Sequence, residues 1–223
     1  IPAEYLKETK RYTKHVVLSG KTISDAAKKM LSEKEKDWFD ISTLKEPFRV
    51  EGKKTMGYEI AEQLGWELPD VIIYETGGGT GLIGMWKAFV ELKSIGRING
   101  KLPRMVAAQS NGCAPVVDAF QRLKDSTDFW ENSNTIALGL NVPGPLGGHW
   151  ILDILYQSDG IAIDVPEKKL EDLTKEFIET TMINAGPEAG VVWGAYKTLK
   201  DISWIKPDES VVLFATGIER CKL

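Results

Sequence analysis

Short apolar runs alternate along this chain with longer segments in which apolar residues recur at helical spacing. Most residues within the runs are apolar. Strands with this pattern are buried on both faces, as in a parallel sheet covered by helices. The predicted strands are His15–Leu18, Val71–Tyr74, Arg104–Ala108, Ile161–Val165 and Val211–Ala215.

Stripes of apolar residues at intervals of three and four predict the helices. One stripe joins Leu82, Met85, Phe89 and Leu92. The other helices are predicted over 3–12, 24–32, 114–123, 146–156, 167–184 and 187–199, and around the stripe Met56, Ile60 and Leu64. The predicted fold class is therefore α/β, with a mostly parallel sheet and helices on both of its faces.

The first segment of the chain reads as a helix–strand–helix unit of its own. We assign residues 1–45 to the remnant of a smaller domain and residues 46–223 to a large cofactor-binding domain. The chain opens on Ile1 and runs straight into a helical pattern. We therefore expect that the beginning of the protein lies elsewhere.

Composition narrows the classes of partner. The net charge of -4 argues against nucleic acid and anionic membranes as partners, because both need clustered Lys and Arg. No apolar run approaches the ~20 residues of a membrane span. The two cysteines, Cys113 and Cys221, lie far apart and indicate neither a disulfide framework nor a metal site. These features favour a cytoplasmic protein without a metal.

The stretch from Val71 to Leu82 carries the most chemical information. A buried strand leads into Thr76-Gly77-Gly78-Gly79-Thr80-Gly81, and a helix follows. Amide groups at a helix start have no partner within the helix, and the helix dipole adds positive potential there. Glycines let such amides approach an anion closely, so the pattern predicts a phosphate site. The alternative is that these glycines only form a tight turn.

The spacing of the loop argues against two common nucleotide sites. It is not G-x-x-x-x-G-K-[ST], and it departs from G-x-G-x-x-G. The next strand ends on Ala108-Gln109-Ser110, without the acidic residue that would hold a ribose. A compact phosphorylated cofactor fits better than a dinucleotide.

Four segments in this order resemble the threonine synthase branch of the fold-type-II pyridoxal-phosphate enzymes, which have a fold like that of the tryptophan synthase β chain. They are 47–55 (PFRVEGKKT), 76–84 (TGGGTGLIG), 109–115 (QSNGCAP) and 211–217 (VVLFATG). The combination E-G-K-K-T-x-x-Y-E followed by T-G-G-G-T-G-L is fairly specific, whereas either motif alone is weak.

The resemblance implies roles for particular residues. Pyridoxal 5'-phosphate is the implied cofactor, and Thr216 would bond its ring nitrogen. Arg49, with Ser42 as a weaker match, would bind the phosphate of a small phosphorylated amino acid, O-phosphohomoserine. The loop residues that match the cofactor-phosphate cradle are Gly77, Gly78, Gly79, Thr80 and Gly81. A supporting role near the site is open for Glu188, and a homodimer is compatible with the resemblance.

The family's lysine, which forms the Schiff base with the cofactor, is missing from this sequence. The family carries it in a serine–phenylalanine–lysine–aspartate stretch, and no such stretch occurs here. We therefore assign no catalytic residue to the chain and expect no turnover from it alone. The implied activity of the protein is a lyase reaction of threonine biosynthesis, from O-phosphohomoserine and water to threonine and phosphate. The alternatives are cysteate synthesis, serine or threonine dehydration, and a non-catalytic domain that binds a phosphate ligand.

Overall fold

A computed structural model describes residues 3–218 of the chain. The chain divides into two compact units, Ile1–Trp38 and Phe39–Leu223. The elements in chain order are α1 (Ala3–Tyr12), α2 (Ile23–Glu33), α3 (Phe48–Gln63), β1 (Val71–Glu75), α4 (Thr80–Ser94), β2 (Arg104–Ser110), α5 (Pro115–Gln121), η1 (Leu138–Leu140), α6 (Gly148–Gln157), β3 (Ile161–Val165), η2 (Glu167–Lys169), α7 (Leu170–Thr181), α8 (Pro187–Asp201) and β4 (Val211–Leu213).

The first unit contains two helices and no strand in its described part. Helix α2 begins with a capping box, in which the Thr22 hydroxyl accepts from the Asp25 amide and the Asp25 carboxylate accepts from the Thr22 amide. The strand predicted over residues 15–18 is wrong. Val17 is 69% exposed and Leu18 is 59% exposed, and no described strand pairs with them. A lone apolar run without a pairing partner cannot hold an extended ladder.

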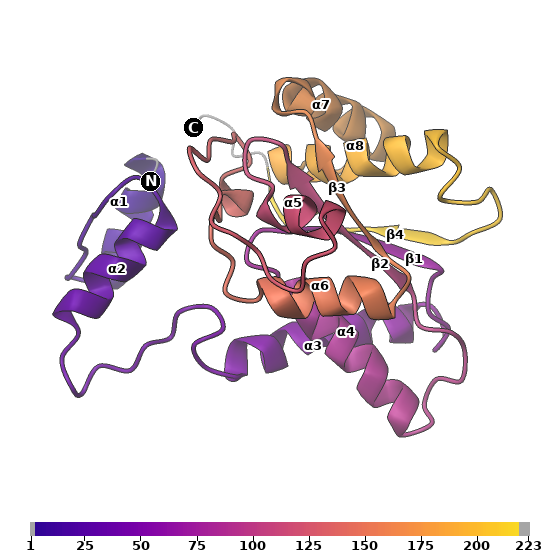
Figure 1. The fold of residues 1–223 in the computed structure, drawn as a ribbon, viewed down its shortest axis with the longest axis horizontal. Helices are drawn as coiled ribbons and strands as arrows, with labels where there is room; N and C mark the ends of the chain where they lie inside the picture. Colours follow the sequence, from indigo (N-terminus) through magenta and orange to yellow (C-terminus); the bar gives the residue numbers. More distant parts are fainter. Residues whose placement is uncertain (1–2, 219–223) are drawn as a thin grey trace. The chain divides into compact units, whose positions relative to one another are not determined.

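The second unit is built on a four-stranded parallel sheet in the order β3-β2-β1-β4 (Figure 1). Strand β1 is central and pairs with β2 on one side and β4 on the other. The predicted strands over 71–74, 104–108 and 161–165 are confirmed, and β1 and β2 extend further, to Glu75 and Ser110. Strand β4 ends at Leu213, earlier than predicted. The α/β fold class with a parallel sheet is confirmed.

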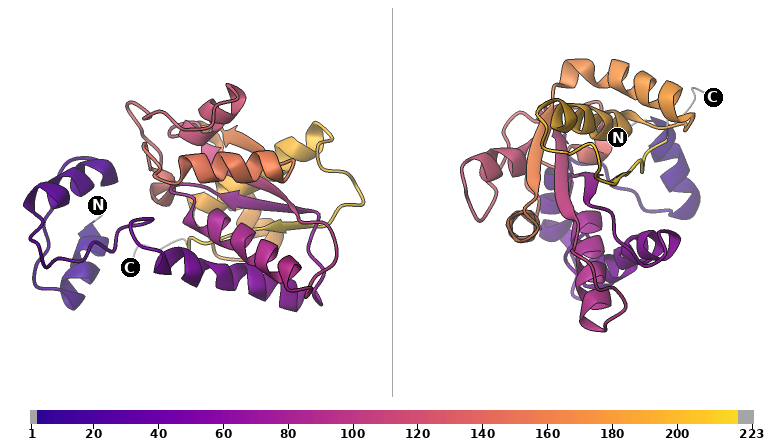
Figure 2. Two further views of the ribbon diagram at one scale, coloured as in Figure 1. Left: turned by 60° about the horizontal axis from the view of Figure 1, so that its bottom comes forward. Right: turned by 90° about the vertical axis from the view of Figure 1, so that its right-hand side faces the viewer.

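Helices cover both faces of this sheet (Figures 1 and 2). The side chains of Ile72 and Met105 point to the face covered by α4, α5 and α6. Their neighbours Ile73 and Val106 point to the opposite face, which α7 and α8 cover. Because both faces are buried, successive residues of β1 and β2 are apolar without the alternation of a half-exposed strand.

The helices agree with the predicted stripes apart from their ends. The stripe around Phe89 forms α4, and Phe89 is fully buried. The helix predicted over 167–184 divides into η2 and α7, and α7 ends where Met182 takes a left-handed conformation at φ 59°. The polar stretch 124–134 contains no helix or strand.

Helices α3 and α4 pack side by side and share a network of charges. Lys54 Nζ lies 2.6 Å from a Glu51 carboxylate oxygen and 2.8 Å from one of Glu91. Lys87 bridges the same two carboxylates at 2.6 and 2.8 Å. The Tyr58 hydroxyl donates to Glu91 at 2.8 Å. These donors lower the pKa of Glu91 to about 2, with the hydrogen bond from Lys54 as the largest cause.

The cysteines and the lack of a long apolar run, both noted in the sequence, can be compared with the structure. Cys113 is fully buried, and desolvation raises the pKa of its thiol to about 11, whereas Cys221 lies outside the described residues. Within residues 3–218 we find no helix with the length and apolarity that a membrane crossing requires.

The Glu91 network predicts a pH-dependent contribution to stability. A carboxyl whose folded pKa lies below its ordinary value of 4.5 stabilises the fold above that value and loses this contribution as pH falls towards about 2. We expect Glu91→Gln to lower the free energy of unfolding by about 1 kcal/mol at pH 7, because solvent screens these half-exposed pairs. Urea unfolding from pH 7 to pH 2 measures this difference, which should shrink across that range. The control is Glu59→Gln, because Glu59 is exposed on α3 and has no described ion pair. This change should leave the free energy of unfolding unchanged.

Candidate functional site

The glycine loop lies at the carboxyl end of the central strand. Strand β1 ends at Glu75 and helix α4 begins at Thr80. The first loop residue is held firmly, because the Thr76 amide donates to Ala108 of β2 at 2.8 Å. Gln109, fully buried on β2, donates its side-chain amide to the Thr76 carbonyl at 2.9 Å. Ligands of open parallel sheets bind beyond the carboxyl ends of the strands, which is where this loop lies.

Part of the glycine content serves packing. Gly79 has φ 78°, a left-handed conformation that favours glycine, and a Cβ there would lie 2.2 Å from Ile151 Cδ1. A Cβ at Gly81 would lie 2.1 Å from the Tyr74 hydroxyl. Gly78 is different, because a Cβ there would meet only Thr43, at 3.8 Å. The tight-turn explanation therefore accounts for some of these glycines and leaves Gly78 open.

The backbone amides of the loop are stronger evidence for an anion site than the glycines are. Among the residues that the structure describes, the amides from Gly77 to Leu82 donate no hydrogen bond to a protein acceptor, and the helical pattern starts with the Ile83 amide and the Gly79 carbonyl. The half-buried Thr80 hydroxyl also has no described partner. A cluster of free donors at the positive end of a 15-residue helix can bind an anion.

The residue that ends β1 links this loop to the last strand. Glu75 is 3% exposed. Its Oε1 accepts from the Thr216 amide at 2.9 Å and from the Thr216 hydroxyl at 2.5 Å. Its Oε2 is buried without a partner in the described structure. Burial raises the pKa of Glu75 to about 7, and the hydrogen bonds from Thr216 only partly oppose this.

The start of helix α8 closes the same region. Glu188 Oε1 accepts from the Gly139 amide of η1 at 3.0 Å. The Gly186 amide, just before α8, donates to the Gly217 carbonyl at 3.1 Å. A Cβ at Gly217 would lie 2.8 Å from Glu188 Oε2. The structure therefore brings Glu188 beside the segment that carries Thr216.

The two residues predicted to bind substrate lie in and after the segment before α3. The Ser42 amide donates to Asp40 at 2.9 Å, and the next residue, Thr43, is the one nearest to Gly78. Arg49 lies exposed in the first turn of α3, and its amide donates to Glu46 at 3.2 Å. The structure thus brings the Ser42 segment to the loop and records no contact between Arg49 and the loop. Their roles remain predictions.

Our sequence reasoning assigned no role to Glu75 or Gln109. Both are polar residues at the carboxyl ends of strands that are otherwise buried and apolar. That pattern is a usable signal, because a polar side chain inside a buried strand needs a specific partner. The partner of Glu75 is 141 residues away in sequence, so spacing alone could not identify it.

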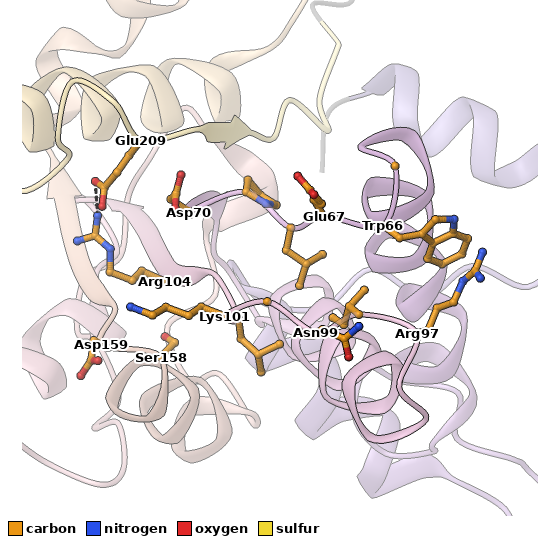
Figure 3. A pocket seen from close by; sticks show the side chains of 16 residues that line it. Trp66, Glu67, Asp70, Arg97, Asn99, Lys101, Arg104, Ser158, Asp159 and Glu209 are labelled. Atoms are coloured by element: carbon orange, nitrogen blue, oxygen red, sulfur yellow. Dashed lines mark hydrogen bonds and ion pairs between the residues drawn. The ribbon is translucent and has the colours of Figure 1, made fainter.

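A hollow of about 810 Å³ lies at the opposite, amino ends of the strands (Figure 3). Two of its cations are engaged and one, Lys101, has no described partner: Arg104 pairs with Glu209 at 2.6 Å, and Arg97 stacks on Trp66 at 3.7 Å. Acidic side chains, among them Asp70, share the lining. This hollow therefore offers an anion less than the free amides of the glycine loop do.

Several characterised proteins are similar to this chain in sequence. It is 32% identical over 171 residues to the threonine synthase of Methanocaldococcus jannaschii and 30% identical over 171 residues to that of Methanosarcina acetivorans. Each match covers 77% of this chain and 42% of the relative. The cysteate synthase of Methanococcoides burtonii is 28% identical over 150 residues, which cover 67% of this chain and 36% of that protein. The matched segments thus cover less than half the length of these relatives.

Solved structures support the fold. A fungal L-serine ammonia-lyase from Rhizomucor miehei matches with a TM-score of 0.79 at 18% identity, over 98% of this chain and 67% of that one. Maize serine racemase matches with a TM-score of 0.74 at 20% identity, over 99% and 65%. The family model described as pyridoxal-phosphate dependent enzyme matches residues 1–217. With the sequence identity to threonine synthases, these matches show that the chain belongs to the fold-type-II family of pyridoxal-phosphate dependent enzymes.

Proposed function

We propose that the protein is a threonine synthase, which converts O-phosphohomoserine and water to threonine and phosphate. One observation carries the proposal: the run of unpaired amides from Gly77 to Leu82, which follows the Glu75 carboxyl that Thr216 donates to, in a chain 32% identical to a named threonine synthase. The chain covers 42% of that relative, so the activity is proposed for the complete protein. The chain itself lacks the serine–phenylalanine–lysine–aspartate stretch, and we expect no turnover from it alone.

The cofactor of the family, pyridoxal 5'-phosphate, fits the residues that are present. Its phosphate carries about two negative charges at neutral pH, as other phosphate monoesters do. The free amides at the start of α4, the helix dipole and the Thr80 hydroxyl would hold that phosphate. In the proposal, the residues of this cradle are Gly77, Gly78, Gly79, Thr80 and Gly81. When bound, the cofactor supplies an electron sink for the substrate carbon that loses its proton.

Thr216 would contact the pyridine nitrogen of the cofactor. Its hydrogen bonds to Glu75 fix the backbone and the hydroxyl of Thr216 at the end of the β1–β4 pair, close to where the loop starts. A side chain held in this way loses little rotamer freedom when a ligand binds. This arrangement supports the role that the resemblance implies.

The substrate phosphate would be bound on the other side of the loop. The nearness of Thr43 to Gly78 supports a role for Ser42, because it brings this segment to the proposed cradle. Arg49 is exposed, and its guanidinium has no described ion-pair partner, so it is available for a ligand. A fork of N–H donors suits a phosphoryl group. The division into a smaller domain (1–45) and a large domain (46–223), a homodimer, a cytoplasmic location and the absence of nucleic-acid partners stay predictions.

A sister reaction on the same fold is the second candidate. Cysteate synthase is named among relatives at 28% identity, and serine ammonia-lyase and threonine deaminase are named among similar structures. These names favour a neighbouring substrate as the alternative to O-phosphohomoserine. A non-catalytic phosphate-binding role is the third candidate.

An assay of the complete gene product separates these candidates. Supplied with pyridoxal 5'-phosphate, it should release phosphate from O-phosphohomoserine and form threonine in equal amounts. Formation of cysteate from O-phosphoserine and sulfite, or of ammonia from serine or threonine, would assign a sister reaction instead. A protein that binds the cofactor and turns over none of these substrates would support the non-catalytic role.

The phosphate cradle predicts a selective effect of Thr80→Val. This change removes one hydroxyl donor and keeps the shape of the side chain. We expect binding of pyridoxal 5'-phosphate to weaken about tenfold, because a hydrogen bond to a charged group contributes roughly 1.5 kcal/mol or more. Calorimetric titration measures this affinity. Pyridoxal, which has no phosphate, should bind equally to both proteins, and Thr55→Val on the exposed side of α3 serves as the matched control. An equal loss for pyridoxal would contradict the cradle.

The proposed role of Arg49 predicts a loss of substrate affinity. Arg49→Gln removes an exposed guanidinium and should leave folding unchanged. We expect the KM for O-phosphohomoserine in the complete protein to rise by about tenfold to a hundredfold, as for loss of a charge-assisted phosphate contact. Arg122→Gln removes another exposed arginine, which directly follows α5 and pairs with Asp118 of that helix, and should not change KM. An unchanged KM in the Arg49 variant would remove this residue from the site.

A further inference from the structure

Gln109 is a polar side chain enclosed between the central strands and helix α5. It lies near the end of β2 and is 0% exposed. Its Nε2 donates to the Thr76 carbonyl at 2.9 Å, and its Oε1 accepts from the amides of Val116 and Val117 at 2.9 and 3.2 Å. A buried side-chain amide needs partners at both of its ends, and Gln109 has them.

The contacts with α5 fix which way the Gln109 amide faces. Val116 and Val117 are the second and third residues of α5, so their N–H groups have no acceptor within that helix. If the side-chain amide were turned over, its NH2 group would face these two donors, and its oxygen would face the Thr76 carbonyl. The NH2 group of Gln109 is therefore held toward Thr76.

Thr76 is engaged through all of its polar groups. Its amide donates to the Ala108 carbonyl at 2.8 Å, and its hydroxyl donates to the Tyr74 carbonyl at 2.9 Å. Its carbonyl accepts from Gln109. Thr76 is also 0% exposed, so the glycine loop starts from a residue with a fixed place just after β1.

The carbonyl of Thr76 belongs to the same planar peptide group as the amide of Gly77. That peptide bond is trans. In a trans peptide group the C=O and the N–H point in opposite directions. Because the carbonyl points to Gln109, the Gly77 N–H points away from it. Gln109 thus sets the direction of the first free amide of the loop.

The Gly77 amide is costly without a ligand. Gly77 is buried, and its N–H has no protein acceptor in the part of the chain that the structure describes. A buried donor without an acceptor lowers stability. Gly77 also has little room to turn, since a Cβ there would lie 2.7 Å from the Gly139 carbonyl oxygen. If the peptide group did turn over, its N–H would face the NH2 group of Gln109, which is also a donor.

We propose that Gln109 is a positioning residue of the phosphate cradle, which orients the Gly77 amide toward the cofactor phosphate through the Thr76 carbonyl. The inference rests on the proposed cofactor site and adds to it a residue that acts through the backbone of the loop. Gln109 serves binding only, and no atom is transferred.

The first test compares two ligands of the complete protein. Gln109→Met keeps the length of the side chain and removes its donor and its acceptor. We expect binding of pyridoxal 5'-phosphate to weaken about tenfold, because one oriented donor to a charged group is lost. Binding of pyridoxal, which has no phosphate, should stay the same. Calorimetric titration measures both affinities.

The matched control is Ser158→Ala. Ser158 is buried, and its hydroxyl accepts from the Met105 amide at 3.2 Å, near the amino end of β2. This change also removes a buried side-chain bond to the backbone of β2, so it should lower the free energy of unfolding and leave both affinities unchanged. Equal losses for pyridoxal 5'-phosphate and pyridoxal in Gln109→Met would indicate a purely structural residue and overturn the inference.

A second variant covers the case in which Gln109→Met does not fold. Gln109→Glu keeps an oxygen for the two α5 amides, and those donors favour the carboxylate. A carboxylate has no hydrogen for the Thr76 carbonyl. At pH 9 this variant should show the same selective loss of affinity for pyridoxal 5'-phosphate. Wild-type affinity in this variant would contradict the proposed role.

NMR observes the Gly77 amide directly. Threonine labelled with ¹³C at the carbonyl and glycine labelled with ¹⁵N select the Thr-Gly peptide groups, which in this chain are 76–77, 80–81 and 216–217. Thr76→Val removes the 76–77 signal and so assigns it. In wild type the Gly77 amide proton should move downfield when pyridoxal 5'-phosphate is added, and this shift should be lost in Gln109→Met. An equal shift in both proteins would refute the inference.

The outcomes separate this inference from the proposed function. If wild type binds pyridoxal 5'-phosphate more tightly than pyridoxal and the Gln109 variants keep that difference, the inference fails and the cofactor site stands. If wild type binds the two ligands equally, the proposed cradle fails and the inference with it.

Discussion

The parallel pairing of β1 with β2 and β4 determines where chemistry can take place in this protein. Because the three strands run in the same direction, their carboxyl ends lie together at one edge of the sheet. The Thr76 amide is hydrogen-bonded to the end of β2, and Glu75 is hydrogen-bonded to Thr216 just after β4. After Thr76 the chain passes through the glycine loop into α4, whose first amides are unpaired. Without this pairing, the glycine loop, the last strand and the start of α8 would not lie together.

The sequence predicted well those elements that a local pattern of apolar residues determines. The strands over 71–74, 104–108 and 161–165 are continuous apolar runs, and they form because both faces of the sheet are covered. The run over 15–18 looks the same in sequence and forms no strand. An apolar run becomes a strand only when a neighbour supplies its hydrogen bonds, and a local pattern does not contain that information.

Part of the candidate site could be predicted from the sequence. The structural reason to expect an anion there differs in part from the number of glycines, which is the signal that the sequence offers. Counting glycines points to a ligand, yet Gly79 and Gly81 are also required by the close approach of Ile151 and Tyr74. The evidence for an anion lies in the amides that remain without acceptors, and these can be recognised only in three dimensions. The contact between Glu75 and Thr216 joins residues that are 141 apart, so their spacing in the sequence could not predict it.

Glu75 carries a cost that its surroundings do not offset. A carboxylate that is 3% exposed needs a cation or several donors, and Thr216 supplies two bonds to one oxygen only. Burial therefore raises the pKa of Glu75 to about 7, and the hydrogen bonds from Thr216 oppose this only in part. The end of β1 and the segment after β4 thus depend on each other. Thr216 supplies the described donors of the buried carboxyl, and Glu75 in turn fixes the backbone and the hydroxyl of Thr216 at the carboxyl ends of the strands.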